Sequence, residues 1–182
     1  EAGHRIRPAS GYRAAPGGPD EDRTGNFKYG GWVANLWDDK MNETMEEFSG
    51  KEFELLLGRK TYEIFAAHWP YHKEDDIGER LNRSKKYVAS KTLNKLDWEN
   101  SHLIKGDIVK ELIKLKQQEG PEIQLYGSAN LVQTLLKNNL VDVIQLFIFP
   151  IVIGKGKRLF QEGVIPSQFQ VSDSKVSSTG TI

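Results

Sequence analysis

Three short polar segments of this sequence contain residue types that bind phosphate groups. They are Gly58-Arg59-Lys60-Thr61, Ser90-Lys91-Thr92 and Gly127-Ser128-Ala129. The first and third place a glycine where a predicted strand becomes a helix, so a phosphate can approach free backbone N–H groups at the positive end of the helix dipole. The second offers two hydroxyls and an ammonium. One glycine turn alone indicates little, but the three segments together favour a site for the phosphates of a dinucleotide.

Two standard nucleotide-binding motifs do not fit. Gly154-Lys155-Gly156 begins a G-x-G, but Leu159 stands where the Rossmann fingerprint requires its third glycine. The segment Gly58-Arg59-Lys60-Thr61 lacks the earlier glycine of a P-loop. The sequence therefore predicts neither a Rossmann domain nor a P-loop NTPase.

Alternating strands and helices must position these segments. Between Glu122 and Phe160, a buried strand at 123–126, a short helix and an apolar strand at 143–149 predict a βαβ unit with parallel strands. Upstream, the patterns predict strands at 53–57, 87–89 and 102–104, and helices at 59–67, at 77–83 and from Ile108. Downstream, residues 169–171 and 175–177 predict a terminal hairpin. We expect an α/β fold with a mostly parallel central sheet and an antiparallel C-terminal hairpin.

Composition excludes several classes of protein. The chain has 182 residues, 25 basic and 25 acidic side chains and no cysteine. A net charge of zero does not provide the basic field that duplex nucleic acid requires, and without cysteine neither a disulfide nor a thiolate metal site is possible. His68 and His72 have the spacing of a helical metal pair, but Pro70 lies between them. We expect a cytoplasmic protein with no metal site and no nucleic-acid or membrane partner.

The first residues differ in composition from the remainder. Residues 1–31 are rich in glycine and proline, with arginine interspersed and no apolar periodicity. They predict a poorly ordered or atypical N-terminal arm over residues 1–25, followed by one domain over residues 26–182.

Four blocks, in the same order, resemble the dihydrofolate reductase-like superfamily. They are Leu55–Pro70, Lys86–Leu93, Leu125–Leu136 and Phe149–Phe160. More narrowly, the sequence resembles the stand-alone bacterial branch related to the C-terminal reductase domain of RibD, the deaminase-reductase of riboflavin biosynthesis. The resemblance implies a three-layer α/β/α fold with NADPH bound across the sheet. It also implies a homodimer that pairs near the strand at 143–149.

The resemblance also implies roles for individual residues. The cofactor phosphates would contact Gly58, Arg59, Lys60 and Thr61, the adenosine ribose would lie beside Ser90 and Lys91, and the pyrophosphate would lie beside Gly127, Ser128 and Ala129. Arg59, with help from Lys60, Ser90 and Lys91, would favour NADPH over NADH, because a guanidinium pairs well with a 2′-phosphate. The implied reaction is NADPH-dependent reduction of a small pyrimidine- or pterin-like molecule, such as 5-amino-6-(5-phosphoribosylamino)uracil.

Two departures from the family pattern affect the expected activity. Residues 4–14 show neither the apolar first strand nor the Leu-Asp-Gly-like turn that usually opens this family. Trp32 and Asp38 resemble the Trp–Asp pair of dihydrofolate reductases, but their spacing is one residue off, so they are weak catalytic candidates. The alternative is a non-catalytic dinucleotide- or ligand-binding protein that retains the fold.

Overall fold

The computed structural model describes residues 3–10, 18, 26–49, 52–74, 76–154, 159–160 and 165–182. In chain order the elements are β1 (Ile6–Ser10), α1 (Asp39–Ser49), β2 (Phe53–Gly58), α2 (Arg59–His68), a short 3-10 turn η2 (Trp69–Tyr71), α3 (Asp76–Arg83), β3 (Lys86–Ala89), β4 (Ser101–Ile104), α4 (Ile108–Lys116), β5 (Glu122–Gly127), α5 (Ala129–Lys137) and β6 (Gln145–Leu146). None of the helices described is long and apolar enough to span a membrane.

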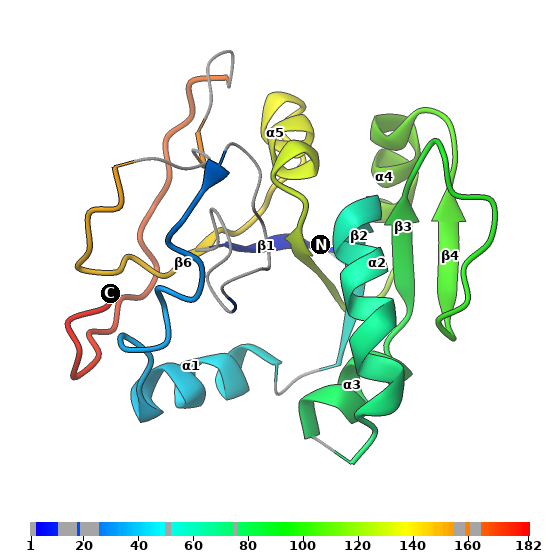
Figure 1. Cartoon of the computed structure of the whole chain (residues 1–182). Helices are drawn as coiled ribbons and strands as arrows, with labels where there is room; N and C mark the ends of the chain where they lie inside the picture. Colours follow the sequence, from blue (N-terminus) through cyan, green and yellow to red (C-terminus); the bar gives the residue numbers. More distant parts are fainter. Residues whose placement is uncertain are drawn as a thin grey trace.

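The six strands form one sheet in the order β4-β3-β2-β5-β1-β6 (Figure 1). Each neighbouring pair within this order runs parallel. The expectation of a mostly parallel sheet is confirmed. Because the strands are parallel, the carboxyl ends of β3, β2 and β5 meet at one edge, which is where open α/β sheets bind ligands.

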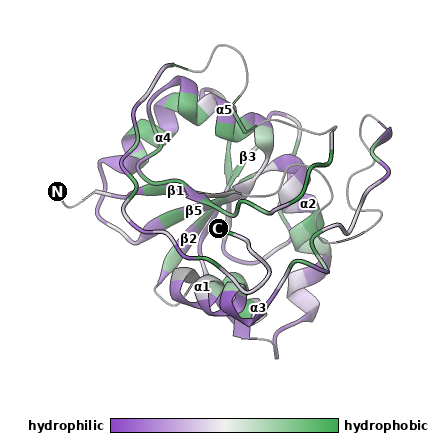
Figure 2. Cartoon of the chain, turned by 90° about the vertical axis from the view of Figure 1, so that its left-hand side faces the viewer, coloured by the Kyte–Doolittle hydropathy of each residue, from purple (hydrophilic) through white to green (hydrophobic). Residues whose placement is uncertain are grey.

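Helices cover both faces of the sheet and so give three layers. On one face, α4 and α5 pack on a core that includes Leu56, Ile123 and Leu125. On the other face, α2 and α3 pack on Leu55, Leu57 and neighbouring apolar residues. Side chains alternate across a strand, so Leu56 serves one core while its two neighbours serve the other. Figure 2 shows this division, with α4 and α5 on one side of the central strands and α1 and α3 on the other.

Residues 6–10 form a strand that the sequence pattern does not predict. β1 lies between β5 and β6, and Ile6 and Pro8 are fully buried. A proline inside a short polar run argues against an internal strand, which is why the pattern was misleading. The expectation that residues 4–14 lack a strand is wrong. The parts of the predicted arm at 11–17 and 19–25 lie outside the described residues, so the boundary at residue 25 stays a prediction.

Tertiary contacts hold β1 in place. The carboxylate oxygen Oδ2 of Asp142 accepts a hydrogen bond from the Ile6 N–H at 2.7 Å, and the Ile6 carbonyl accepts one from the Asp142 N–H at 3.0 Å. Lys116 Nζ donates to both oxygens of the Asp142 carboxylate. The side chain of Arg7 pairs with Glu122 at 3.0 Å. Residues far along the chain therefore specify this strand.

The C-terminal part departs from the predicted hairpin. Only Gln145–Leu146 of the expected strand at 143–149 is paired in the sheet. No strand is assigned at 169–171 or 175–177, so the prediction of a hairpin there is wrong. Instead, Ile148 and Ile182 exchange two backbone hydrogen bonds of 2.7 and 3.0 Å, as residues of antiparallel strands do. The chain end therefore returns to the same sheet edge through a different segment.

Candidate functional site

The three phosphate-type segments lie side by side at the carboxyl ends of the central strands. Gly58 ends β2 and is the register partner of Ala89, the last residue of β3, so Ser90 follows directly beside it. On the other side of β2, Leu57 pairs with Gly127, the last residue of β5. The sheet order thus brings together the three segments whose residue types suit phosphate binding.

The two glycine junctions fit into each other. A Cβ atom on Gly58 would lie 2.6 Å from Ser128 Oγ, and a Cβ on Gly127 would lie 2.8 Å from Thr61 Oγ1. Gly127 also has a φ of +136°, which side chains rarely adopt. Each glycine therefore leaves room for a hydroxyl at the first turn of the neighbouring helix. The same lack of side chains leaves the backbone accessible where α2 and α5 begin.

Both helices that start at this edge lack a side-chain cap. Gly58, the N-cap residue of α2, has no side chain to cap with, and the side chain of Ser128, the N-cap residue of α5, makes no capping hydrogen bond. By contrast, Asp107 caps α4 by accepting from two backbone N–H groups, and Asp38 accepts from the Met41 N–H in α1. Uncapped first-turn N–H groups need another partner, and an anion is well suited to that position.

Arg59 connects two of the segments. Its Nη1 donates to Thr92 Oγ1 at 3.2 Å, and its Nε lies 3.7 Å from a carboxylate oxygen of Glu63. Ser90 is buried, and its hydroxyl oxygen accepts hydrogen bonds from the N–H groups of Thr92 and Leu93. This oxygen is therefore already used within the turn. Ser90 therefore stabilises the turn after β3, while the guanidinium of Arg59 lies beside that turn and is partly exposed.

The lysines and hydroxyls of the segments have different surroundings. Lys60 and Lys91 are exposed, so their ammonium groups can reach a bound anion. Thr61, Ser128 and Ala129 are half-buried. These residues and the two glycines suit a dinucleotide: they offer backbone donors, hydroxyls and cations at one edge. Their assignment to cofactor binding stays a prediction.

Asp38 has a structural task in this protein. Its Oδ2 accepts hydrogen bonds from the Ser178 N–H at 2.7 Å and the Ser178 hydroxyl at 2.6 Å, and a longer one from the Thr179 N–H. The hydroxyl of Ser178, followed by the backbone N–H groups of Met41, Thr179 and Ser178, lowers the pKa of Asp38 to about 2. An acid with that pKa is ionised at neutral pH and is a poor proton donor. Its contacts favour a role in holding the C-terminal turn, although its catalytic assignment stays a prediction.

Trp32, the other catalytic candidate, packs against the region that follows β6. Its ring makes an edge contact with Phe149 at a centroid distance of 5.1 Å. The rings of Trp37 and Phe147 also lie near each other, tilted by 41° with their centroids 6.3 Å apart. The segment 31–38 therefore packs along the β6 edge of the sheet. The side-chain hydrogen bonds of Asp38 go to the Met41 N–H and to the C-terminal turn, away from the three phosphate-type segments.

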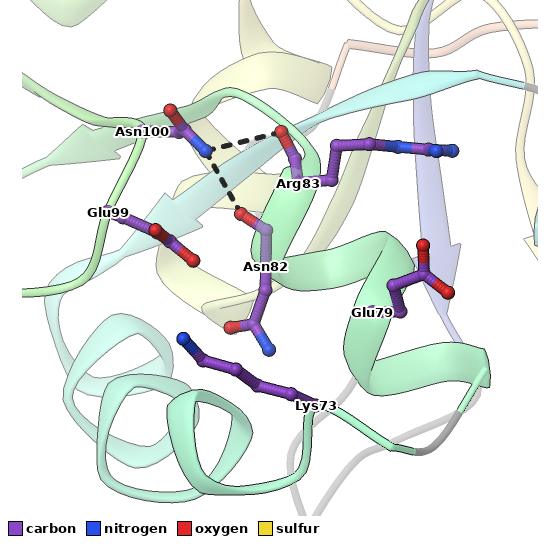
Figure 3. Close-up of a pocket in the computed structure, with 6 residues that line it drawn as sticks. All are labelled: Lys73, Glu79, Asn82, Arg83, Glu99 and Asn100. Carbon is purple, nitrogen blue, oxygen red and sulfur yellow. Dashed lines mark hydrogen bonds between the residues drawn. The ribbon is translucent and has the colours of Figure 1, made fainter.

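One pocket lies at the opposite end of the strands. It has a volume of about 310 Å³ and is lined by Lys73, Glu79, Asn82, Arg83, Glu99 and Asn100 (Figure 3). Asn100 Nδ2 donates to the carbonyl oxygens of Asn82 and Arg83, and the Asn82 side chain is bonded to Trp69 and Trp98. The amide groups of Asn82 and Asn100 thus serve the fold. This pocket is separate from the candidate dinucleotide site.

Sequence reasoning missed two features of the candidate site. The pairing of Arg59 with Glu63 follows an i, i+4 spacing within α2, which was visible in the sequence. The contact between Arg59 and Thr92 joins residues 33 positions apart and had no local signal. Within the described residues, no group of three or more His, Asp or Glu side chains is placed to hold a metal ion.

Comparisons with known proteins agree with this fold. The family model described as the RibD C-terminal domain matches residues 10–182. The uncharacterized protein YyaP of Bacillus subtilis (strain 168) is 33% identical over 132 residues, which is 70% of each chain. The uncharacterized protein YwjB of the same organism is 26% identical over 124 residues, or 66% of each chain.

Solved structures show the same architecture. A putative riboflavin biosynthesis protein from Shewanella sp. PV-4 superposes with a TM-score of 0.66 at 20% identity, covering 98% of this chain and 94% of that one. A pyrimidine reductase-like protein from Corynebacterium diphtheriae gives 0.56 at 12% identity, covering 98% and 89%. Dihydrofolate reductase from Enterococcus faecalis, solved with NADP(H), gives 0.50 at 12% identity, covering 86% and 77%. The fold is dihydrofolate reductase-like, and the chain belongs to the RibD C-terminal domain family.

Proposed function

We propose that this protein is an NADPH-dependent reductase of a small pyrimidine- or pterin-like molecule, of the type that reduces 5-amino-6-(5-phosphoribosylamino)uracil. The observation that carries the proposal is the pair of interlocked glycine junctions, Gly58 with Ser128 and Gly127 with Thr61. These junctions bring two uncapped helix N-termini together at the carboxyl edge of a parallel sheet. Family membership and the reductase-like structural neighbours support the reaction class.

The residues at this edge fit a phosphorylated dinucleotide. First-turn N–H groups of α5, beside Gly127, would face the pyrophosphate, and those of α2 would face the adenosine side. Arg59, Lys60 and Lys91 supply positive charge on the same side as the turn after β3. When bound, NADPH supplies the hydride, and the protein's contribution is to bind it, orient it and shield it from water.

Cofactor choice gives a direct test of this proposal. Arg59 offers a planar, charge-assisted contact to the 2′-phosphate of NADPH, worth roughly 1.5–3 kcal/mol per hydrogen bond. We expect the protein to bind NADPH about ten- to a few-hundred-fold more tightly than NADH at fixed salt. The variant Arg59→Ala should lose this preference while keeping its affinity for NADH. Equal affinities in the wild type would contradict the proposed cofactor.

A second candidate is a cofactor- or ligand-binding protein without turnover. The engagement of Asp38 with Ser178 favours it, because that carboxylate is not available as a proton donor. Binding and turnover separate the two candidates. NADPH oxidation on addition of pyrimidine or pterin substrates supports the reductase, whereas NADPH binding without oxidation of any of them supports the second candidate.

A further inference from the structure

The guanidinium of Arg59 is held in one orientation by two neighbours. Nη1 donates to Thr92 Oγ1 at 3.2 Å, and Nε faces Glu63 Oε1 at 3.7 Å. The Arg59 side chain is nevertheless 46% exposed. Among the described residues, Nη2 has no hydrogen-bond or ion-pair partner. One edge of the planar group is therefore fixed by the protein while another edge is left for a ligand.

Thr92 is itself held firmly enough to act as a support. The Ser90 hydroxyl oxygen accepts from the Thr92 N–H at 3.2 Å and from the Leu93 N–H at 3.0 Å, which locks the turn after β3. Ala89, the residue before this turn, is the register partner of Gly58 at the start of α2. The backbone therefore places the Thr92 hydroxyl opposite the first turn of α2, where Arg59 begins.

We propose that Thr92 is a positioning residue that sets the preference for a 2′-phosphorylated cofactor by orienting Arg59. This inference rests on the proposed function, because it assumes that NADPH binds at this edge. Without Thr92, the long arginine side chain would have to be ordered by the ligand itself, which weakens binding. NADH lacks the 2′-phosphate, so its binding does not depend on that orientation.

Glu63 also holds Arg59, but its charge acts in the opposite direction. A carboxylate 3.7 Å from Nε supports the orientation, yet it repels an incoming phosphate dianion. The variant Glu63→Gln keeps an oxygen that can accept from Nε and removes the charge. We expect it to bind NADPH as tightly as the wild type or up to about fivefold more tightly. The two variants thus distinguish the effect of Thr92 on the orientation of Arg59 from the effect of the Glu63 charge on NADPH affinity.

The experiment is a titration of NADPH and NADH into the full chain at fixed salt, followed by calorimetry. Thr92→Val removes the acceptor while keeping the shape of the side chain, and Thr92→Ser restores it. We expect Thr92→Val to weaken NADPH about five- to tenfold, with NADH changed less than twofold and Thr92→Ser close to the wild type. Thr134→Val is the matched control, because that hydroxyl bonds only to the Asn130 carbonyl within α5.

A double-mutant cycle tests whether Thr92 acts through Arg59. If it does, Thr92→Val has no further effect on NADPH affinity in the Arg59→Ala background. A persisting loss in that background would show direct contact and overturn the positioning role, as would a Thr92→Val variant that weakens both cofactors alike or neither. Wild-type protein that binds neither cofactor overturns the proposed function and this inference together. An NADPH preference that Thr92→Val leaves at its wild-type size overturns the inference alone.

Discussion

The hydroxyl oxygen of Ser128 lies 2.6 Å from the position that a Cβ atom on Gly58 would take. The two residues belong to different strand-to-helix junctions, at the ends of β2 and β5. A substitution at one junction must therefore change the packing at the other. This relationship makes the candidate site one packed unit rather than two independent turns, and it can be tested by coupling.

Gly58→Ala should destabilise the protein by about 1–3 kcal/mol, the usual cost of overpacking. The backbone at Gly58, with φ −75° and ψ 159°, is accessible to alanine, so the cost arises from contact with Ser128 rather than from strain. The double variant Gly58→Ala/Ser128→Ala should lose less stability than the sum of the single variants. Urea unfolding of the four proteins measures this coupling, and strict additivity would contradict it.

The contact of Asp38 with the C-terminal turn predicts an acid-dependent stability. Hydrogen bonds lower the folded pKa from 3.8 to about 2, so the stabilisation is present above pH 3.8 and is lost as the pH falls towards 2. Asp38→Asn should be less stable than the wild type at pH 5–7, and the two melting curves should converge near pH 2. Asp39→Asn, at the exposed neighbouring position, is the control. A difference in melting temperature between wild type and Asp38→Asn that stays constant with pH would disprove this explanation.

Asp142 should prove necessary for β1. Replacing it with alanine leaves the Ile6 N–H without its carboxylate partner, which costs roughly 1–3 kcal/mol for a buried donor. We expect faster hydrogen exchange at the Ile6 amide in Asp142→Ala, measured by mass spectrometry or NMR. Asp173→Ala, on an exposed segment, should leave that amide unchanged. Equal protection of Ile6 in both variants would show that β5 alone holds the strand.

Because Lys86 is buried, we expect the free energy of unfolding to increase in mildly alkaline solution. The side chain is fully buried, and its Nζ donates to the carbonyls of Asn82 and Ser84 over the ring of Trp98. Burial lowers the folded pKa from 10.5 to about 8. Between these values the unfolded chain binds more protons, so stability increases with pH across pH 8–10.5.

The test compares the pH dependence of melting in the wild type and in Lys86→Met. The difference between the two proteins should shift in favour of the wild type as the pH rises from 8 to 10.5. Lys73→Met, an exposed position, should give a curve parallel to the wild type. Parallel curves for Lys86→Met as well would mean that Lys86 titrates normally.

We also predict a homodimer that covers the β6 edge. The segment after β6 exposes 59% of Ile148 and 96% of Val152, and exposed apolar side chains of this kind favour burial against another chain. Light scattering at micromolar concentration should give the mass of a dimer. Val152→Lys should shift the mass towards the monomer, whereas Ile77→Lys, an exposed isoleucine on α3, should not. A monomeric wild type would remove this prediction.

The sequence was sufficient for the elements whose signals are local. β2, β3, β4 and β5 and the helices α2 to α5 appear within a few residues of their predicted limits, because apolar runs, helical stripes and glycine or proline stops mark them. The three phosphate-type segments follow from the same logic, since parallel strands bring their carboxyl ends together. Fold class and the place of the candidate site were therefore predictable.

Elements that depend on distant partners were not predictable. β1 contains Arg7 and Pro8 and exists because Asp142 and β5 fix it. Of the apolar strand predicted at 143–149, only Gln145–Leu146 pairs in the sheet, and it lies at the edge, where Ile148 pairs with Ile182 close to the end of the chain. Asp38 read as a candidate acid because nothing local reveals its contact with Ser178, 140 residues away. The residues around each position carry no signal for such long-range contacts.

The place of β1 in the sheet has a consequence for synthesis on the ribosome. Ile6 meets its carboxylate partner Asp142 across a sequence separation of 136 residues, and its β5 neighbours also come late. At about 5–20 residues per second, the nascent strand waits on the order of ten seconds before a partner emerges. β2, β3 and β4 can pair during that interval. The cell must therefore keep the first strand unpaired and unaggregated until β5 leaves the exit tunnel.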